Sequence, residues 1–207
     1  MATIIFRNKK ETGLETHMEQ EIDTTKTGGH TCPWWLQFTF DNPLRRLVHD
    51  PQKLLRPYVR SGDTVLDVGC GMGFFSLGLA EMVGKDGKVI AADLQEQMLA
   101  GLQKRAENAG MFERIQLCRS TPDDIGVNEP IQFALAFWMV HEVRRPDLFL
   151  GQIHKLLVPG GRFLIVEPYI HVSSKVFNQT VLLAENSGFR FVDRPKVRAS
   201  RAILLGR

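Results

Sequence analysis

Short runs of apolar residues alternate with amphipathic segments along most of this 207-residue chain. Runs rich in branched residues predict buried strands, and apolar positions three and four residues apart predict helices. The expected strands are 64–68, 88–93, 115–118, 131–138, 162–167, 189–194 and 199–206. The expected helices are 74–82, 95–109, 147–157 and 173–186, preceded by two short helices that begin at Pro43 and Pro51.

Strands that alternate with helices are typical of an α/β fold with a mostly parallel sheet and helices on both of its faces. The last two strands follow one another without a helix, so they predict an antiparallel pair. Ligands of open α/β sheets bind beyond the carboxyl ends of the strands. The loops that leave those ends are therefore where we expect a functional site.

A glycine-rich turn follows the first of these strands. Gly69, Gly71 and Gly73 occupy alternate positions before the helix that begins at Phe74. Glycine lets the backbone approach a ligand closely, and a helix N-terminus offers N–H groups to anionic or polar atoms. Asp67 lies at the end of the strand, where its carboxylate can reach an amine or a hydroxyl. The turn therefore predicts a site for a polar ligand.

The spacing of these glycines differs from the G-x-G-x-x-G pattern of dinucleotide-binding proteins, whose third glycine allows close packing of helix and strand. Phe74 stands where that third glycine would fall. A bulky residue at this position argues against close contact with a pyrophosphate, and so against a dehydrogenase.

Asp93 ends the second strand, twenty residues beyond Gly73. A carboxylate at this point can accept hydrogen bonds from ribose hydroxyls. The same carboxylate could instead cap the helix that follows. The preceding glycine turn favours the ribose role.

Composition and charge exclude few functions: 43% of residues are hydrophobic, 24% are charged, and the net charge is +3. This mild charge does not indicate nucleic acid, and the basic groups at Arg144–Arg145 and at 196–201 lie far apart in the sequence. The longest apolar run, 133–140, is too short to cross a bilayer, and residues 1–32 show no signal-peptide pattern. Three cysteines without zinc-like spacing favour a reducing cytoplasm and no metal site.

Residues 1–42 differ from the rest and are expected to form an N-terminal arm, with the ligand-binding domain at 43–207. Residues 1–30 are polar, whereas 31–40 contain four aromatic side chains. The aromatic segment could pack the arm onto the domain or could cap a substrate pocket. The arm could equally be exchanged between two subunits of a homodimer, or fold over bound substrate.

Four segments, in their order and spacing, resemble the class I methyltransferases that use S-adenosylmethionine (SAM), and especially small-molecule enzymes of the quinone-biosynthesis type. These segments are Val65–Gly73 with its D-x-G-x-G-x-G form, Val89–Asp93, Phe133–His141 and Leu156–Glu167. The resemblance covers residues 60–170. It implies the Rossmann-like fold of that family with a reversed final strand, SAM as methyl donor and S-adenosylhomocysteine (SAH) as product.

The resemblance also implies roles for individual residues. Asp67 would hold the methionine ammonium, and Asp93 would take the ribose hydroxyls. The family usually has Gly-Asp-Ala after the third strand, where this chain has Arg119-Ser120-Thr121, so the adenine contact would pass to Ser120 or to the carboxylates at 123–124. The implied SAM-binding residues are Asp67, Gly69, Cys70, Gly71, Gly73, Asp93, Leu94, Ser120, Thr121, Phe137 and Trp138.

Methyl transfer from a sulfonium depends on positioning, and it needs a base when the acceptor arrives protonated. His141 is the candidate base because it follows the fourth strand and titrates near neutrality. A loop histidine satisfied by the backbone is the alternative. Trp138 could attract the sulfonium through its ring or could belong to the core. The candidate acceptor contacts are Cys32, Trp34, Trp35, His141 and Tyr169.

The leading functional hypothesis is methyl transfer to a small apolar or aromatic acceptor, which the aromatic segment 34–40 and Trp138 favour. An RNA or protein methyltransferase would need a basic surface near the pocket. The Asn-Pro-Pro-Tyr-like loop of amino-nitrogen methylation is absent, since 137–140 read Phe-Trp-Met-Val, so nucleic acid is disfavoured as a partner. A non-catalytic module that binds SAM or a nucleoside is the third alternative. No membrane partner is expected.

Overall fold

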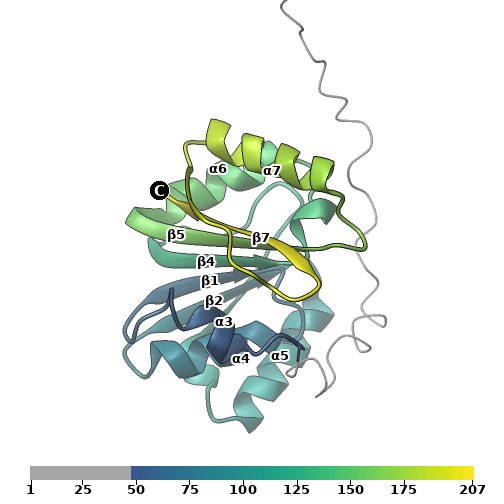
Figure 1. The fold of residues 1–207 in the computed structure, drawn as a ribbon. Helices are drawn as coiled ribbons and strands as arrows, with labels where there is room; N and C mark the ends of the chain where they lie inside the picture. Colours follow the sequence, from purple (N-terminus) through teal and green to yellow (C-terminus); the bar gives the residue numbers. More distant parts are fainter. Residues whose placement is uncertain (1–47) are drawn as a thin grey trace, which may run out of the picture.

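A seven-stranded sheet lies at the centre of residues 48–207, the part of the chain that the computed structural model describes (Figure 1). The strands are β1 (Thr64–Val68), β2 (Lys88–Asp93), β3 (Ile115–Arg119), β4 (Ile131–Phe137), β5 (Leu157–Pro168), β6 (Arg190–Asp193) and β7 (Ser200–Gly206). The helices are α3 (Pro51–Leu55), α4 (Phe74–Val83), α5 (Glu96–Asn108), α6 (Pro146–Leu156) and α7 (Ser174–Asn186), with short 3₁₀ turns η2 (Phe112–Arg114) and η3 (Val140–Glu142).

The strands lie side by side in the order β3-β2-β1-β4-β5-β7-β6. Neighbouring strands from β3 to β5 are parallel, whereas β7 runs antiparallel to both β5 and β6. The expected mostly parallel sheet with a reversed last strand is thus confirmed. Strands β2 and β3 are added on one side of β1, and β4 and β5 on the other, so the strand order reverses between β1 and β4, which is the switch point where ligands of such sheets bind.

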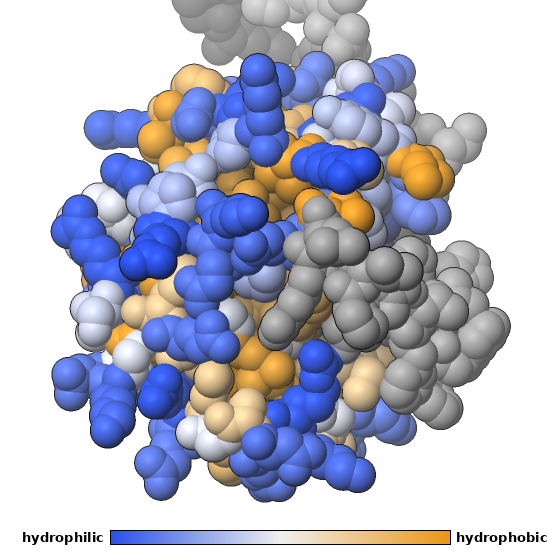
Figure 2. Space-filling model, turned by 60° about the horizontal axis from the view of Figure 1, so that its bottom comes forward, coloured by the Kyte–Doolittle hydropathy of each residue, from blue (hydrophilic) through white to orange (hydrophobic). Residues whose placement is uncertain are grey.

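Helices cover both faces of the sheet, with α6 and α7 on one side and α3, α4 and α5 on the other (Figure 1). Each face closes over its own apolar cluster, because buried strands present alternate residues to opposite sides. Leu135 and Phe137 of β4 belong to one cluster, and Ala134 and Ala136 belong to the other. The face that carries α3, α4 and α5 is hydrophilic along much of its outline (Figure 2).

Two element boundaries differ from the sequence prediction by more than one residue. The helix that begins at Pro51, capped by the Asp50 carboxylate, ends at Leu55 rather than near Tyr58, because Pro57 has no N–H with which to continue the helical hydrogen bonds. Strand β5 begins at Leu157, which pairs with Ile131, and the expected turn at 159–161 is an irregularity within this strand. The helix expected at Pro43 lies outside the described residues.

Within residues 48–207, every helix is too short or too polar to cross a membrane.

Candidate functional site

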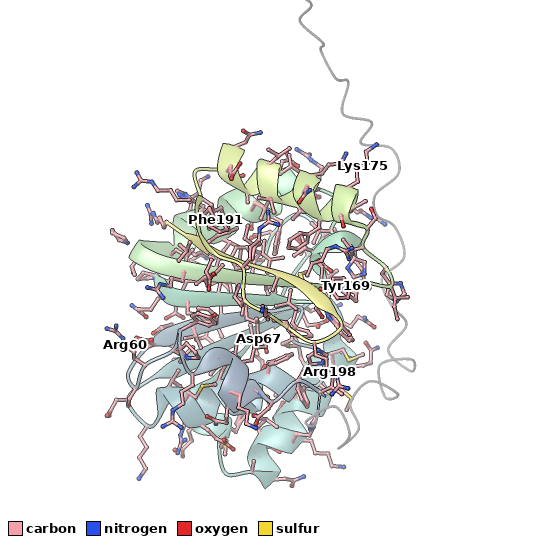
Figure 3. All side chains as sticks on the ribbon, in the orientation of Figure 1. Arg60, Asp67, Tyr169, Lys175, Phe191 and Arg198 are labelled. Carbon is pink, nitrogen blue, oxygen red and sulfur yellow. The ribbon has the colours of Figure 1, made fainter. Side chains whose placement is uncertain are left out.

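The candidate site is built at the carboxyl ends of the parallel strands. There β1 leads into the glycine turn, β2 ends at Asp93, β4 leads into η3, and β5 leads into the loop that contains Tyr169. Figure 3 places Asp67 in the interior of the molecule and Tyr169 at the end where these strands finish, opposite Arg60, which precedes β1. The sheet therefore brings together the segments that the sequence placed at this edge.

Three glycines of the turn have backbone conformations that residues with a side chain rarely adopt. Gly69, Gly71 and Gly73 have φ values of 69°, 54° and 82°, in the left-handed region that favours glycine. The N–H groups of Gly69 and Cys70 both donate to the Ala92 carbonyl, which fixes the turn against β2. A Cβ on Gly69 would lie 2.8 Å from Met139 Cγ, so the turn also touches the loop that follows β4.

Substitution of Gly73 by alanine is expected to destabilise the fold through this geometry. An added Cβ would lie 2.1 Å from Leu102 Cδ1 of α5. The left-handed backbone costs about 1–2 kcal/mol for alanine, and overpacking adds about 1–3 kcal/mol. Gly62→Ala is the matched control, because Gly62 has φ +85° with nothing within 4 Å of an added Cβ. Urea unfolding should show a larger loss of unfolding free energy for Gly73→Ala; equal losses would contradict the role of Leu102.

Asp93 joins the glycine turn to the helix after β2. Its side chain is 7% exposed; Oδ2 accepts a hydrogen bond from the Gly71 N–H and Oδ1 accepts one from the Gln95 N–H, each at 2.9 Å. Burial raises the pKa of this carboxyl, and the backbone hydrogen bonds oppose the rise. The helix cap weighed from the sequence is not formed, because Gln95 is the N-cap residue of α5 and no side chain caps the helix. The carboxylate instead ties the glycine turn to the residue that precedes α5.

Asp67 is 2% exposed and lies beneath the turn. Its Oδ2 accepts a hydrogen bond of 2.5 Å from the Ser76 hydroxyl in the first turns of α4. This contact orients the carboxylate, and sequence reasoning did not single out Ser76. The cysteine between Gly69 and Gly71 is buried, and desolvation, with the charges of Asp67 and Asp93, raises the pKa of the Cys70 thiol well above its ordinary value. Cys70 is thus an inert small residue in the turn.

The loop after β3 is folded on itself. The Ser120 hydroxyl donates to the Ile125 carbonyl, and the backbone N–H of Thr121 donates to the Asp124 carbonyl. Ser120 Oγ retains acceptor capacity, since a hydroxyl oxygen has two lone pairs. Leu94, 40% exposed directly after Asp93, offers an apolar surface suited to the face of a purine.

Trp138 leaves β4 in a strained conformation, with a φ of 61°. Its backbone N–H donates to the Val166 carbonyl at 2.7 Å, and its indole N–H donates to Ser200 Oγ at 2.9 Å. The His49 ring packs edge-on against Phe137 and Trp138, with ring centroids 5.1 Å apart in each case. These contacts hold Trp138 between β5, β7 and the first described residues, and Ser200 and His49 were not singled out from the sequence.

His141 and Glu167 form a hydrogen-bonded pair after β4 and at the end of β5, in which Glu167 is buried and His141 is half-buried. Glu167 is 1% exposed; its Oε1 accepts a hydrogen bond from the His141 backbone N–H at 3.0 Å, and its Oε2 lies 2.6 Å from Nδ1 of the imidazole. Because a carboxylate can only accept, the neutral ring carries its proton on Nδ1. Nε2 is then the basic atom of His141. The sequence placed Glu167 at this edge without assigning it this role.

Opposing effects set the pKa of His141. Burial favours the neutral ring and lowers the pKa, but the hydrogen bond and charge of Glu167, with the charge of Glu142, outweigh burial and raise it above the ordinary 6.5. The stabilisation from the pair is therefore complete below the unfolded-state pKa and is lost as the pH rises through the folded-state pKa.

The loss of stabilisation from the His141–Glu167 pair should appear when the free energy of unfolding is measured as a function of pH. As the pH rises above the ordinary pKa of histidine, the unfolding free energy of the natural protein should fall relative to that of His141→Gln, whose side chain does not titrate. Chemical unfolding of both proteins across the range measures the difference. A difference that stays constant with pH would show that Glu167 does not stabilise the charged ring.

The remaining predicted acceptor contacts divide into two groups. Tyr169 is 54% exposed, and the Arg201 guanidinium carbon lies 4.5 Å from the centre of its ring. His171, in the same loop, has its ring parallel to that of His141 with centroids 6.0 Å apart. Cys32, Trp34 and Trp35 lie outside the described residues. Across residues 48–207, no group of three or more His, Cys, Asp or Glu side chains is placed to hold a metal ion.

These features define a class of protein when they are compared with known families. A family model for the methyltransferase domain matches residues 59–188. The chain therefore belongs to the class I SAM-dependent methyltransferases, whose Rossmann-like sheet it shares.

Similar proteins support this assignment. The ubiquinone/menaquinone biosynthesis C-methyltransferase UbiE of Francisella tularensis subsp. holarctica is 32% identical over 137 residues, which cover 62% of this chain and 53% of that protein. The chain thus spans about half the length of the curated relatives it matches. A SAM-dependent methyltransferase from Aquifex aeolicus superposes with a TM-score of 0.76 at 25% identity, covering 85% of this chain and 99% of that one.

A more distant structure shares the fold alone. Fibrillarin of Aeropyrum pernix, solved in complex with natively bound SAM, superposes with a TM-score of 0.60 at 15% identity and covers 72% of this chain and 68% of its own.

Proposed function

We propose that this protein transfers the methyl group of SAM to a small-molecule acceptor, with His141 as the general base. One observation carries the proposal: the His141–Glu167 pair lies at the same sheet edge as the glycine turn and Asp93. Among the alternatives, a module that merely binds SAM has no need of a buried carboxylate that orients a basic nitrogen. The pair therefore favours catalysis over binding alone.

The residues of the edge fit SAM. The glycines of the turn at 69–73 allow a close backbone approach, and the carboxylates of Asp67 and Asp93 are buried near it. In the proposed complex Asp67 holds the ammonium, Asp93 the ribose hydroxyls, and Leu94 with Ser120 and Thr121 the adenine. When bound, SAM supplies an electrophilic methyl group on a positively charged sulfur.

The protein's own contribution to the reaction is positioning and proton transfer. Trp138, held by Ser200 and the Val166 carbonyl, borders the methionyl end. Nε2 of His141 accepts the proton of the acceptor, and Glu167 stabilises the imidazolium that results. Positioning supplies most of the rate enhancement, because in-line methyl transfer requires the acceptor atom to be aligned with the methyl group and the sulfur.

Two observations support a small acceptor. The curated relatives are named as C-methyltransferases of ubiquinone and menaquinone biosynthesis, and the sequence places aromatic side chains both at 34–40 and at Trp138. We further propose that residues 1–42 form a substrate cap beside a SAM-binding domain at 43–207, with Cys32, Trp34 and Trp35 among the acceptor contacts.

Calorimetric titration with SAM, SAH and NAD tests the cofactor assignment. We expect SAM and SAH to bind and NAD not to bind. Transfer of a labelled methyl group from SAM to a panel of phenols, quinols and thiols then tests the acceptor class. Binding of NAD in place of SAH would contradict the assignment, and SAH binding without transfer to any small acceptor, but with transfer to RNA or protein, would contradict a small-molecule substrate.

A further inference from the structure

Four exposed basic residues from three separate segments lie along the acceptor side of the candidate site. We define them as the basic rim. They are Arg144 after η3, Lys175 in the first turn of α7, and Lys196 and Arg198 between β6 and β7. The sequence separates these groups by up to 54 positions, and the fold brings them to one edge.

Strand pairing explains this convergence. Pro168, the last residue of β5, pairs with Ser200, the first residue of β7, so the chain entering β7 lies beside the chain leaving β5. The Arg201 guanidinium donates to the Val172 carbonyl and to Ser174 Oγ, which ties the start of α7 to the same place. Figure 3 shows Lys175, Tyr169 and Arg198 at one end of the molecule, and Arg60 at the other.

The rim carries positive charge that the described protein does not neutralise. Arg145, next to Arg144, is bound by Asp147, but within residues 48–207 no carboxylate lies within 4.0 Å of any of the four rim side chains. The opposite half of the edge, after β1, β2 and β3, instead carries the carboxylates of Asp67, Asp93, Asp123 and Asp124. The rim is thus a local basic surface at an edge that also carries Glu142 in η3 and Glu167 in β5, the latter bound to His141.

The backbone that presents the rim is strained. Ala199 has a φ of 55°, unusual for a residue with a side chain. The Ala199 carbonyl accepts a hydrogen bond from the Tyr169 N–H, and the Arg198 carbonyl accepts one from the Ser200 hydroxyl that also holds Trp138. Strained residues persist where the surrounding structure enforces them, often beside ligands. These hydrogen bonds hold the backbone of residues 198–199 beside Tyr169 and the Ser200 hydroxyl that binds Trp138.

We propose that the methyl acceptor carries a negatively charged group, a carboxylate or a phosphate, which the basic rim holds while the reacting atom meets His141. This inference rests on the proposed function and specifies the class of its substrate. An anion bound at the rim and a sulfonium held near the carboxylates of Asp67 and Asp93 would each lie against the complementary charge.

Phenols that differ mainly in the charge of one substituent can test anion binding at the basic rim, although the natural acceptor is not identified. The probes are 4-hydroxybenzoate, 4-hydroxyphenyl phosphate and the neutral 4-hydroxybenzyl alcohol, with dissociation constants measured by ligand-observed NMR at low salt, with and without SAH. Lys196→Gln/Arg198→Gln is the test variant. Arg60→Gln/Lys85→Gln is the control, since these exposed residues precede β1 and β2 at the far end of the strands and the same charge is removed.

We expect one anionic phenol to bind at least about fivefold more tightly than the alcohol, and the rim variant, but not the control, to lose that preference. Added salt should reduce the preference. The better of the two anions identifies the charged group. Equal binding of all three probes, or equal effects of both variants, would overturn the proposal. Salt-dependent binding of a single-stranded RNA much tighter than that of the phosphate probe would overturn it in favour of nucleic acid. Failure of SAH to bind would instead count against the proposed function, because the probes report on the rim alone.

Discussion

His141→Gln is expected to lower kcat by about 10²–10⁴-fold for a hydroxyl acceptor found in the screen, the range typical of a lost general base. The KM for the acceptor and the affinity for SAH should change little, because Nε2 acts on the proton that leaves during transfer. The loss should shrink as the pH approaches the pKa of the acceptor, since the deprotonated acceptor needs no base. Steady-state kinetics across pH measures both effects.

Glu167→Gln separates positioning from proton acceptance. Loss of the carboxylate should lower the pKa of His141, because the hydrogen bond and charge of Glu167 raise it, so the acid limb of the kcat profile should move to lower pH. A plateau kcat below that of the natural protein would report the lost orientation of the ring. If Glu167 had only a structural role, its replacement would lower kcat on both limbs of the pH profile without shifting either limb along the pH axis.

His154→Gln is the control for removal of a histidine. The His154 ring packs on Phe189, with centroids 5.0 Å apart, on the α6 side of the sheet. This variant should keep the natural kcat and pH profile. A kcat for His141→Gln within tenfold of the natural value, with an unmoved acid limb, would refute the base assignment.

Asp93→Ala is expected to weaken SAH binding by about 10–100-fold. Hydrogen bonds to a charged group contribute about 1.5–3 kcal/mol, and tenfold in affinity corresponds to about 1.4 kcal/mol. Part of the loss will come from the Gly71 N–H, which donates to this carboxylate and would lose its acceptor. Calorimetry on the variant alone cannot separate the two effects.

A thermodynamic cycle that combines the Asp93→Ala variant with a modified ligand separates the lost ribose contact from the loss to the glycine turn. An SAH analogue that lacks the ribose hydroxyls should bind the natural protein more weakly than SAH, but should bind Asp93→Ala about as weakly as SAH does. Thermal unfolding of the variant without ligand measures the loss to the turn. If removal of the hydroxyls weakens binding to both proteins by the same factor, Asp93 does not contact the ribose.

The sequence predicted the sheet well because each strand carries its own signal. The apolar run at 131–137 and the glycine turn at 69–73 indicate strand type and the ligand edge through local chemistry, whereas the order of the strands was not predicted. The boundary of β5 was missed because Pro159 and the two glycines after it indicate a turn. Pairing of Leu157 with Ile131 overrides that local preference.

The sequence predicted which positions lie at the site, but it did not predict the hydrogen bonds between their side chains. The signal for Glu167 was its place at the end of β5, but its bond to His141 joins residues 26 positions apart. Ser76 and Ser200 likewise act through contacts across the fold, with Asp67 and Trp138. Such pairs depend on register and on the direction of side chains, which composition and periodicity do not report.

Strand β7 follows β6 in the chain but lies between β5 and β6 in the sheet. During synthesis, β1 to β5 can therefore associate before β7 has left the ribosome, while β5 keeps an open edge and β6 has no strand to pair with. An exposed edge invites pairing with other chains, and the closing contacts are distant in sequence and slow to form. We expect the nascent chain to depend most on chaperones in this interval, which ends when β7 inserts and Ser200 reaches Trp138.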